Sequence, residues 1–276
     1  MRTVIQMTDA TGWPVELGAP PRRIVSLVPS TTETVFALGS GEQVVGVTRY
    51  CVRPDEARQR ARVIGGTKSP RIDVIRRLEP DLILANQEEN REQDVRKLRT
   101  LAPVYVAFPR DVPSAVAEIL NLGILLDREG SARRLAAELA DSLARVREKS
   151  AARPPYSHLY LIWQNPYLCA GPGTFIDALL SETGGRNVIP SGQTRYPEIA
   201  LQQMQQLAPQ VIFLSSEPFP FAEQDRKGLA EKLSGLDWER RCLRVDGQLL
   251  SWHGVRMREG LPYVAGLASE VAALAD

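Results

Sequence analysis

Two segments of the chain follow the same pattern 129 positions apart, and this internal similarity limits the folds that the chain can adopt. Residues 72–84 read IDVIRRLEPDLIL, and residues 201–213 read LQQMQQLAPQVIF. Each pattern predicts a helix, then a proline, one polar residue and an apolar strand. The offset is close to half of the 276 residues. It therefore predicts two related lobes and not a solenoid, whose repeats are much shorter.

Strand and helix patterns alternate along both halves of the chain. Short apolar runs, such as the one at 23–28, are followed by segments with the apolar spacing of helices. This order predicts an α/β fold with largely parallel sheets, preceded by a hairpin formed by residues 4–7 and 15–17. The strands are expected at 23–28, 44–47, 81–85, 104–108, 158–163, 211–214, 243–245 and 249–251.

One long helical pattern separates the two halves. Apolar residues keep helical spacing from Leu135 to Val146, and the pattern predicts a helix at 128–151, roughly 35 Å long at the usual rise per residue. We therefore predict an N-terminal α/β lobe at 1–127, a bridging helix at 128–152 and a C-terminal α/β lobe at 153–276. Two Rossmann-like lobes joined in this way would leave a ligand cleft between them.

Charge and metal-binding residue types exclude several classes of function. The formal net charge is +1, so nothing in the balance predicts a nucleic-acid or anionic-membrane partner. The chain has only two histidines, His158 and His253, and three cysteines with no CxxC pair. These counts argue against a zinc finger or a direct Zn²⁺ or Mn²⁺ receptor. We expect no intrinsic cofactor and no metal held by protein side chains alone.

The start of the chain bears on its compartment. The first residues include Asp9, Pro14 and Glu16 and no apolar run of signal-peptide length. No stretch approaches the roughly 20 apolar residues of a membrane helix. The sequence therefore predicts a soluble chain and leaves three interpretations open: a cytoplasmic protein, a true start further upstream, or a leader that has been removed.

Several motifs, taken in order, resemble one family. They are PRRIVSLVPSTTE at 21–33, VVGV at 44–47 followed by Tyr50, LEPDLIL at 78–84 and GGRNV at 184–188. In this order and spacing they are similar to the helical-backbone (class III) substrate-binding proteins of ABC importers for vitamin B12, haem and ferric siderophores. The likeness covers nearly the whole chain and is greatest to the cobalamin-binding members. It implies a monomeric, non-enzymatic, periplasmic or cell-surface protein that binds a metal chelate between its lobes.

The resemblance also implies which residues face the ligand. Aromatic side chains at strand ends suit a large planar ligand, because flat rigid rings lose little entropy on binding. Ordinary core or rim positions remain the alternative for each of them. A histidine beside them could bind the metal axially, and an arginine could pair with a ligand carboxylate or phosphate. The expected ligand-binding residues are Tyr50, Trp163, Tyr196, Trp252, Arg195 and His253.

Family members dock on their permease through one acidic residue in each lobe. The matching position in the first lobe is Asp73, at the start of a predicted helix. The matching position in the second lobe is Gln202, whose neutral amide lacks the charge of a carboxylate, so Glu198 is the substitute candidate. Asp73 could also be no more than an acidic residue favoured at a helix N-terminus.

Two alternatives keep the fold but change the role. The absent leader and Gln202 favour a cytoplasmic carrier of a corrinoid or another metallocofactor. An enzyme acting on such a ligand at Tyr50, Cys51 or His253 is the other alternative. A catalytic cysteine needs a base and an oxyanion site, and the sequence shows neither beside Cys51. We therefore expect a binding protein and not an enzyme.

Overall fold

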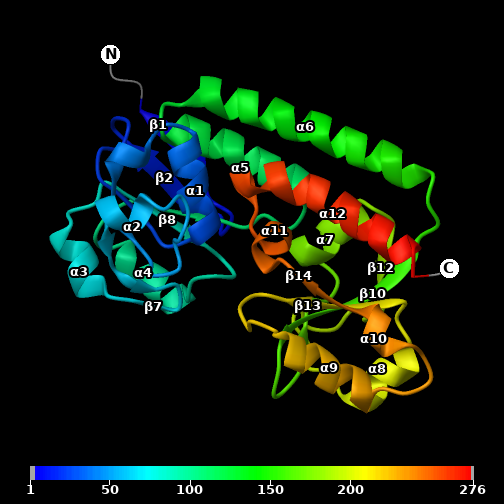
Figure 1. Ribbon diagram of the computed structural model, residues 1–276. Helices are drawn as coiled ribbons and strands as arrows, with labels where there is room; N and C mark the ends of the chain where they lie inside the picture. The colour runs from blue at the N-terminus through cyan, green and yellow to red at the C-terminus, as the bar shows by residue number, and fades with distance from the viewer. Residues whose placement is uncertain (1–3, 275–276) are drawn as a thin grey trace. The chain divides into compact units, whose positions relative to one another are not determined.

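The computed structural model describes residues 4–274, which form two compact units. Each unit has its own sheet with a parallel core, and helix α6 (Glu129–Ala151) links the two (Figure 1). The predicted α/β fold with two lobes and one long connecting helix is confirmed, and that helix begins one residue later than predicted. The lobe boundaries at 127 and 153 remain a prediction. The first unit comprises residues up to Pro109, Pro113–Leu139 and His253–Arg256, and the second comprises Arg110–Val112, Ala140–Trp252 and residues from Met257 onward.

A parallel sheet forms the centre of the first unit, with the strand order β5-β4-β3-β8-β9. Strands β3, β8 and β9 are buried along their whole length. Such uniform burial is typical of parallel strands that are covered on both faces. The sheet strands are β3 (Ile24–Ser26), β4 (Val44–Val47), β5 (Arg62–Val63), β8 (Leu82–Asn86) and β9 (Val104–Ala107).

Helices and two small hairpins surround this sheet. The predicted N-terminal hairpin is present, with Ile5 opposite Leu17 and Thr8 opposite Pro14. The hairpin strands are β1 (Ile5–Thr8), β2 (Pro14–Leu17), β6 (Gly65–Gly66) and β7 (Ser69–Pro70). The helices before α6 are α1 (Pro29–Ala37), η1 (Gly41–Gln43), α2 (Ala57–Arg60), α3 (Ile72–Arg77), α4 (Glu92–Leu98) and α5 (Val112–Leu125).

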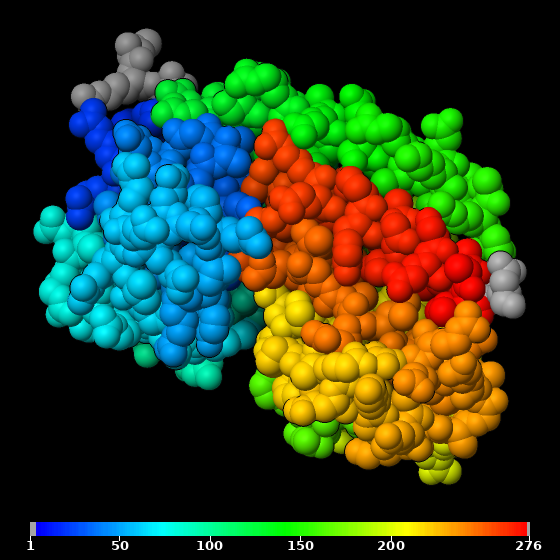
Figure 2. All heavy atoms as spheres, viewed as in Figure 1, coloured from blue at the N-terminus to red at the C-terminus, as the bar shows by residue number. Residues whose placement is uncertain are grey.

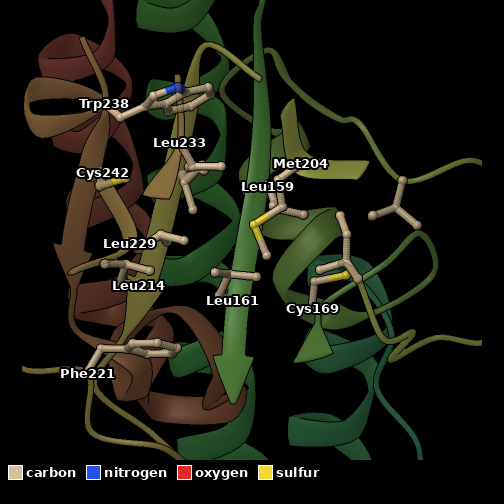
Figure 3. Packing of buried hydrophobic residues seen from close by; sticks show 13 residues of the cluster. Leu159, Leu161, Cys169, Met204, Leu214, Phe221, Leu229, Leu233, Trp238 and Cys242 are labelled. Atoms are coloured by element: carbon tan, nitrogen blue, oxygen red, sulfur yellow. The ribbon is translucent and has the colours of Figure 1, made fainter. Parts of the chain in front are cut away.

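The second unit repeats the same layered plan around strand β10. Strands β12, β13 and β14 continue its sheet in parallel pairing, and β11 adds an antiparallel edge. Figure 3 shows leucines of β10 and β13 packed with Phe221 and Trp238 in this core. Each large apolar side chain that is buried in this way stabilises the fold by about 2 kcal/mol. The strands are β10 (Tyr156–Trp163), β11 (Leu168–Cys169), β12 (Gly185–Asn187), β13 (Val211–Ser215) and β14 (Cys242–Val245).

The internal similarity in the sequence corresponds to a repeated local structure. Helix α3 is followed by Glu79 with φ 44° and then Pro80, and helix α8 is followed by Ala208 with φ 40° and then Pro209. A single left-handed residue ends each helix, and the proline that follows cannot continue it. Strands β8 and β13 follow at the same offset. The helices of the second unit are α7 (Phe175–Ser181), α8 (Leu201–Leu207), α9 (Glu223–Lys232), α10 (Trp238–Arg241), α11 (Gly247–Ser251) and α12 (Met257–Ala272).

The strand predicted at 249–251 is wrong, because these residues belong to helix α11. Asp246 caps this helix: its Oδ1 accepts hydrogen bonds from the backbone nitrogens of Gln248 (2.9 Å) and Leu249 (3.2 Å). A capping carboxylate satisfies donors that have no partner within a helix, so a short apolar run can be helical instead of extended.

A short segment from the C-terminal part of the chain belongs to the first unit. It forms the 3-10 turn η2 (Gly254–Arg256) and packs on α1. The backbone nitrogen of Val255 donates to Thr34 Oγ1 at 3.1 Å, and Arg256 forms an ion pair with Glu33. Gly254 has φ 80°, and a Cβ there would collide with Thr34 Oγ1. Only glycine therefore fits this contact without displacing α1.

Helix α6 is amphipathic. Its buried residues recur at helical spacing from Ala132 to Val146, and charged residues and alanines occupy the exposed positions between them. The exposed side of this helix is seen in green along its length in Figure 2. Within residues 4–274, no helix combines the length and the apolar character needed to cross a bilayer.

Candidate functional site

An aromatic group lies at the carboxyl end of the sheet in the second unit. Trp163 ends β10 with 41% of its surface exposed, and its ring meets that of Phe219 edge-on at 5.7 Å between centroids. Phe219 in turn meets Phe221 at 4.8 Å, and Phe221 is buried. The exposed indole is therefore held by a ring that is anchored in the core. Carboxyl ends of parallel strands are where ligands bind in open α/β sheets.

Tyr196 lies on the extended segment that runs beside this edge. Leu168 of β11 is paired with Trp163 on one side and forms a bridge with Glu198 on the other. Tyr196 has 39% of its surface exposed, so it presents a second ring to solvent from this extended segment. The backbone nitrogen of Gly171 donates to Arg195 O at 2.8 Å, which holds the segment in place.

Arg195 precedes Tyr196 and is partly committed to the protein itself. Its Nε donates to the carbonyl oxygen of Gly173 at 3.0 Å. This bond holds the guanidinium against the turn that precedes helix α7. The structure thus brings Trp163, Arg195 and Tyr196 into one region of the second unit.

Trp252 differs from these residues because its side chain is buried, with 8% of its surface exposed. Its indole Nε1 donates to Glu217 Oε1 at 2.7 Å, and Ser251 Oγ donates to the same oxygen at 3.0 Å. Burial raises the pKa of Glu217, although these hydrogen bonds oppose the effect. Trp252 therefore lies behind the surface and positions the loop that follows β13.

His253 is also buried, and it belongs to the first unit. Its Nε2 lies 3.2 Å from Ser30 Oγ in helix α1. Burial lowers the pKa of His253 to about 4, so the imidazole is neutral at physiological pH. The residue that the sequence places beside Trp252 in a ligand loop is therefore packed against α1.

Tyr50 is the exposed aromatic residue at the carboxyl end of the first unit's sheet. It follows β4 with 52% of its surface exposed. The guanidinium of Arg49 lies 5.7 Å from its ring centroid. A Cβ at Gly66 would lie 3.3 Å from Tyr50 Cε2, so the ring rests against the backbone of the β6–β7 hairpin. These neighbours fix the ring while leaving much of it accessible.

Cys51, next to Tyr50, is buried and unsuited to nucleophilic chemistry. Its Sγ lies 3.1 Å from Thr32 Oγ1 and 3.2 Å from Thr48 Oγ1. Burial raises the pKa of the thiol, whereas a nucleophilic cysteine needs a lowered one. Across residues 4–274, no group of three or more histidine, cysteine, aspartate or glutamate side chains is arranged to hold a metal ion.

The two acidic residues considered for docking are both on the surface of their units. Asp73 lies in the first turn of α3, and its Oδ2 accepts a hydrogen bond from Arg77 at 2.8 Å. Hydrogen bonds, chiefly the one from Arg77, lower the pKa of Asp73, so its carboxylate is ionised at neutral pH. Glu198 is exposed three residues before α8, and Gln202 is exposed in the first turn of that helix.

Sequence reasoning missed two residues of the second unit. Phe219 supports the ring of Trp163, and Glu217 receives the indole hydrogen bond of Trp252. A signal was present in the repeated dipeptide Pro218-Phe219-Pro220-Phe221, which begins three residues after the end of β13. Aromatic residues between prolines in a loop at a strand end are candidates for a surface that binds a ligand.

A family model described as "Periplasmic binding protein" matches residues 24–235. The chain belongs to the periplasmic binding protein family. This membership confirms the family resemblance seen in the sequence. It also confirms that the chain is a binding protein and not an enzyme.

Individual relatives agree with this assignment. The periplasmic binding protein described here is 28% identical over 197 residues to a vitamin B12-binding protein of Vibrio cholerae, covering 71% of each chain. Its fold is similar to that of the periplasmic vitamin B12 binding protein BtuF of Vibrio cholerae, with a TM-score of 0.80, 23% identity and coverage of 91% and 98% of the two chains. The periplasmic heme-binding protein RhuT from Roseiflexus sp. RS-1 gives a TM-score of 0.79, 23% identity and coverage of 92% and 99%.

Proposed function

We propose that this periplasmic binding protein captures a cobalamin-like corrinoid for ABC import, with haem or a ferric siderophore as the other chelates to be tested. The observation that carries the proposal is the exposed indole of Trp163, which Phe219 holds from the core side. A rigid ring at a strand end suits the flat face of a macrocycle. The relative named for vitamin B12 supports a corrinoid as the first choice.

Four residues make up the proposed contact set. Trp163, Arg195 and Tyr196 belong to the second unit, and Tyr50 belongs to the first. The rings contact apolar parts of the ligand, and Arg195 pairs with a phosphate or carboxylate of its periphery. Trp252 and His253 act through other residues, since both are buried and hydrogen-bonded to Glu217 and Ser30.

A titration followed by tryptophan fluorescence tests this function. The full chain is titrated with cyanocobalamin, with hemin and with a ferric hydroxamate siderophore. We expect micromolar or tighter binding of one of them and a loss of about tenfold or more in affinity for Trp163→Ala, since a stacked aromatic anchor contributes a kcal/mol or more. Absence of binding to all three would refute the proposal.

Trp13 offers a matched control. It has 51% of its surface exposed, and it lies beside residues 99–104, which lead into the amino end of β9. Trp13→Ala removes another exposed indole, which lies near the amino end of β9 in the first unit's sheet, whereas Tyr50 of the proposed contact set lies at the carboxyl end of that sheet. It should leave the affinity for the chelate unchanged. An equal loss in both variants would show that Trp163 has no specific role.

We further propose that Asp73 and Glu198 mediate docking on an ABC permease, which places the protein in the periplasm or at the cell surface. Both side chains are exposed on their units. Asp73→Asn should reduce ligand-dependent ATPase activity of the reconstituted permease, while Asp94→Asn on helix α4 should not. Recovery of the native protein only from the cytoplasmic fraction would favour the cytoplasmic carrier, for which Gln202 is the supporting observation.

A further inference from the structure

The segment after strand β4 is a β-turn with Arg49 and Tyr50 at its two corner positions. The backbone nitrogen of Cys51 donates to the carbonyl oxygen of Thr48 at 3.1 Å, which closes the turn. Thr48 and Cys51 are buried, whereas Arg49 and Tyr50 are exposed. The turn is therefore anchored in the core at both ends, and it presents a cation and an aromatic ring to solvent at the carboxyl end of β4.

Arg49 has a fixed backbone and an uncommitted side chain. Its backbone nitrogen donates to the carbonyl oxygen of Gly65 at 2.8 Å, and its own carbonyl oxygen accepts from Arg58 Nη1 at 3.5 Å. Among residues 4–274, no group forms a hydrogen bond or an ion pair with the Arg49 guanidinium, whose one recorded neighbour is the ring of Tyr50. A guanidinium carries five donor hydrogens in a planar fork that matches a carboxylate or a phosphate. These donors are available to a ligand.

Three side chains meet above Gly66 in strand β6. A Cβ built on this glycine would lie 3.2 Å from Ser69 Oγ, 3.3 Å from Tyr50 Cε2 and 3.6 Å from Arg49 Nε. The hydroxyl group, the ring and the guanidinium therefore lie side by side. The guanidinium carbon is 5.7 Å from the ring centroid. A flat ligand that rests on Tyr50 would bring the groups at its edge within reach of Arg49 and Ser69.

We infer that Arg49 determines the charge specificity of the proposed chelate site. This role rests on the proposed function, because Tyr50 belongs to its contact set. Arg49 pairs with a carboxylate or phosphate at the edge of the chelate, and Ser69 Oγ donates a second hydrogen bond to the same group. Hydrogen bonds that involve charged groups are roughly twice as strong as neutral ones, so this position prefers a carboxylate to an amide. The ligand class is a flat chelate with an anionic periphery.

Two corrinoids with the same ring and the same axial cyanides separate the effect of charge from that of shape. The side chains of dicyanocobyrinic acid end in carboxylates, and those of dicyanocobinamide end in amides. Each is titrated against the full chain at pH 7.5 and constant ionic strength, followed by tryptophan fluorescence. We expect the wild type to bind dicyanocobyrinic acid more tightly. Arg49→Gln should lower that affinity by about tenfold or more and change the affinity for dicyanocobinamide by less than about twofold.

Arg76→Gln is the matched control, because Arg76 is an exposed arginine on helix α3 and its replacement changes the net charge equally. It should leave both affinities unchanged. Ser69→Ala should lower only the affinity for dicyanocobyrinic acid, by roughly two- to tenfold. Raising the salt concentration from about 50 mM to about 500 mM should reduce the preference of the wild type, since salt screens exposed charges.

Failure of this role and failure of the proposed function give different results. If the wild type binds both corrinoids and Arg49→Gln weakens the two equally or not at all, the role of Arg49 is refuted and the binding function stands. Tighter binding of dicyanocobinamide than of dicyanocobyrinic acid by the wild type would also refute the role. Binding of neither corrinoid would refute the role of Arg49 together with the choice of a corrinoid as ligand.

Discussion

The indole Nε1 of Trp252 donates a hydrogen bond to Oε1 of Glu217 at 2.7 Å, and this bond joins the end of α11 to the loop after β13. Phe219, which supports Trp163, is two residues from Glu217 in that loop. The hydrogen bond therefore connects the buried Trp252, through the loop that carries Phe219, to the exposed Trp163. Trp252 contributes to the candidate site by positioning the loop and not by presenting its own ring.

Trp252→Phe should destabilise the second unit. The variant removes the indole donor and leaves Glu217, whose pKa burial already raises, with fewer hydrogen bonds. A buried acceptor that loses a partner costs about 1–3 kcal/mol. The shift in the urea midpoint of unfolding measures this loss. Trp163→Phe is the control. It should shift the midpoint much less, because the side chain of Trp163 is substantially exposed.

Phe219→Ala should weaken chelate binding without abolishing folding. Phe219 is half-buried and meets Trp163 and Phe221 edge-on. Aromatic pairs contribute about 0.5–1.5 kcal/mol beyond their buried area, so loss of the support should lower affinity by roughly two- to tenfold. The fluorescence titration with cyanocobalamin measures it. An affinity equal to that of the wild type would show that Trp163 needs no support from Phe219.

The fold could be predicted from the sequence because its signals are local and repeated. Apolar runs bounded by proline identified β8 and β13, and the 129-residue offset between them identified the two lobes. The prediction of a strand at 249–251 is wrong because Leu249 and Leu250 lie in helix α11, which Asp246 caps. A run of only three residues fits both the two-residue repeat of a strand and the 3.6-residue repeat of a helix. The N-terminal cap therefore decides that this segment is helical.

The candidate site was less predictable because exposure depends on tertiary packing. Tyr50, Trp163 and Tyr196 were named from strand ends and family likeness, and all three rings are substantially exposed. Trp252 and His253 were named by the same reasoning and are buried. Nothing local in the sequence indicates that a glutamate 35 residues earlier accepts from Trp252, or that residues 253–256 pack on α1.

Arg256→Gln should destabilise the first unit. The Arg256 side chain is almost fully buried and pairs with Glu33, whose side chain is 15% exposed. Removing one member of a buried ion pair leaves the other charge uncompensated, which typically costs about 3–5 kcal/mol. Urea unfolding followed by circular dichroism measures the change. Arg77→Gln, which breaks the exposed pair with Asp73, is the control and should destabilise the protein far less, because solvent screens exposed ion pairs.

His158 should make the second unit sensitive to acid. It is fully buried in β10, and neither ring nitrogen has a hydrogen-bond partner among the described residues. Burial lowers its pKa to about 3, whereas the unfolded chain has the ordinary value of 6.5. Between these two values the unfolded state binds more protons than the folded state. Stability is therefore lost as pH falls from 6.5 toward 3, by up to about 1.4 kcal/mol for each pH unit.

His158→Leu should remove this dependence, because leucine cannot take up a proton in the unfolded state. Unfolding by urea at pH 7.5 and pH 5 measures the effect: the difference in free energy of unfolding between the two pH values should be smaller in the variant than in the wild type. His253 has a pKa lowered by burial to about 4 and lies in the other unit, so its own contribution should persist in His158→Leu and disappear in His253→Gln. If His158→Leu retained the full wild-type difference, the acid sensitivity would have to come from groups other than His158.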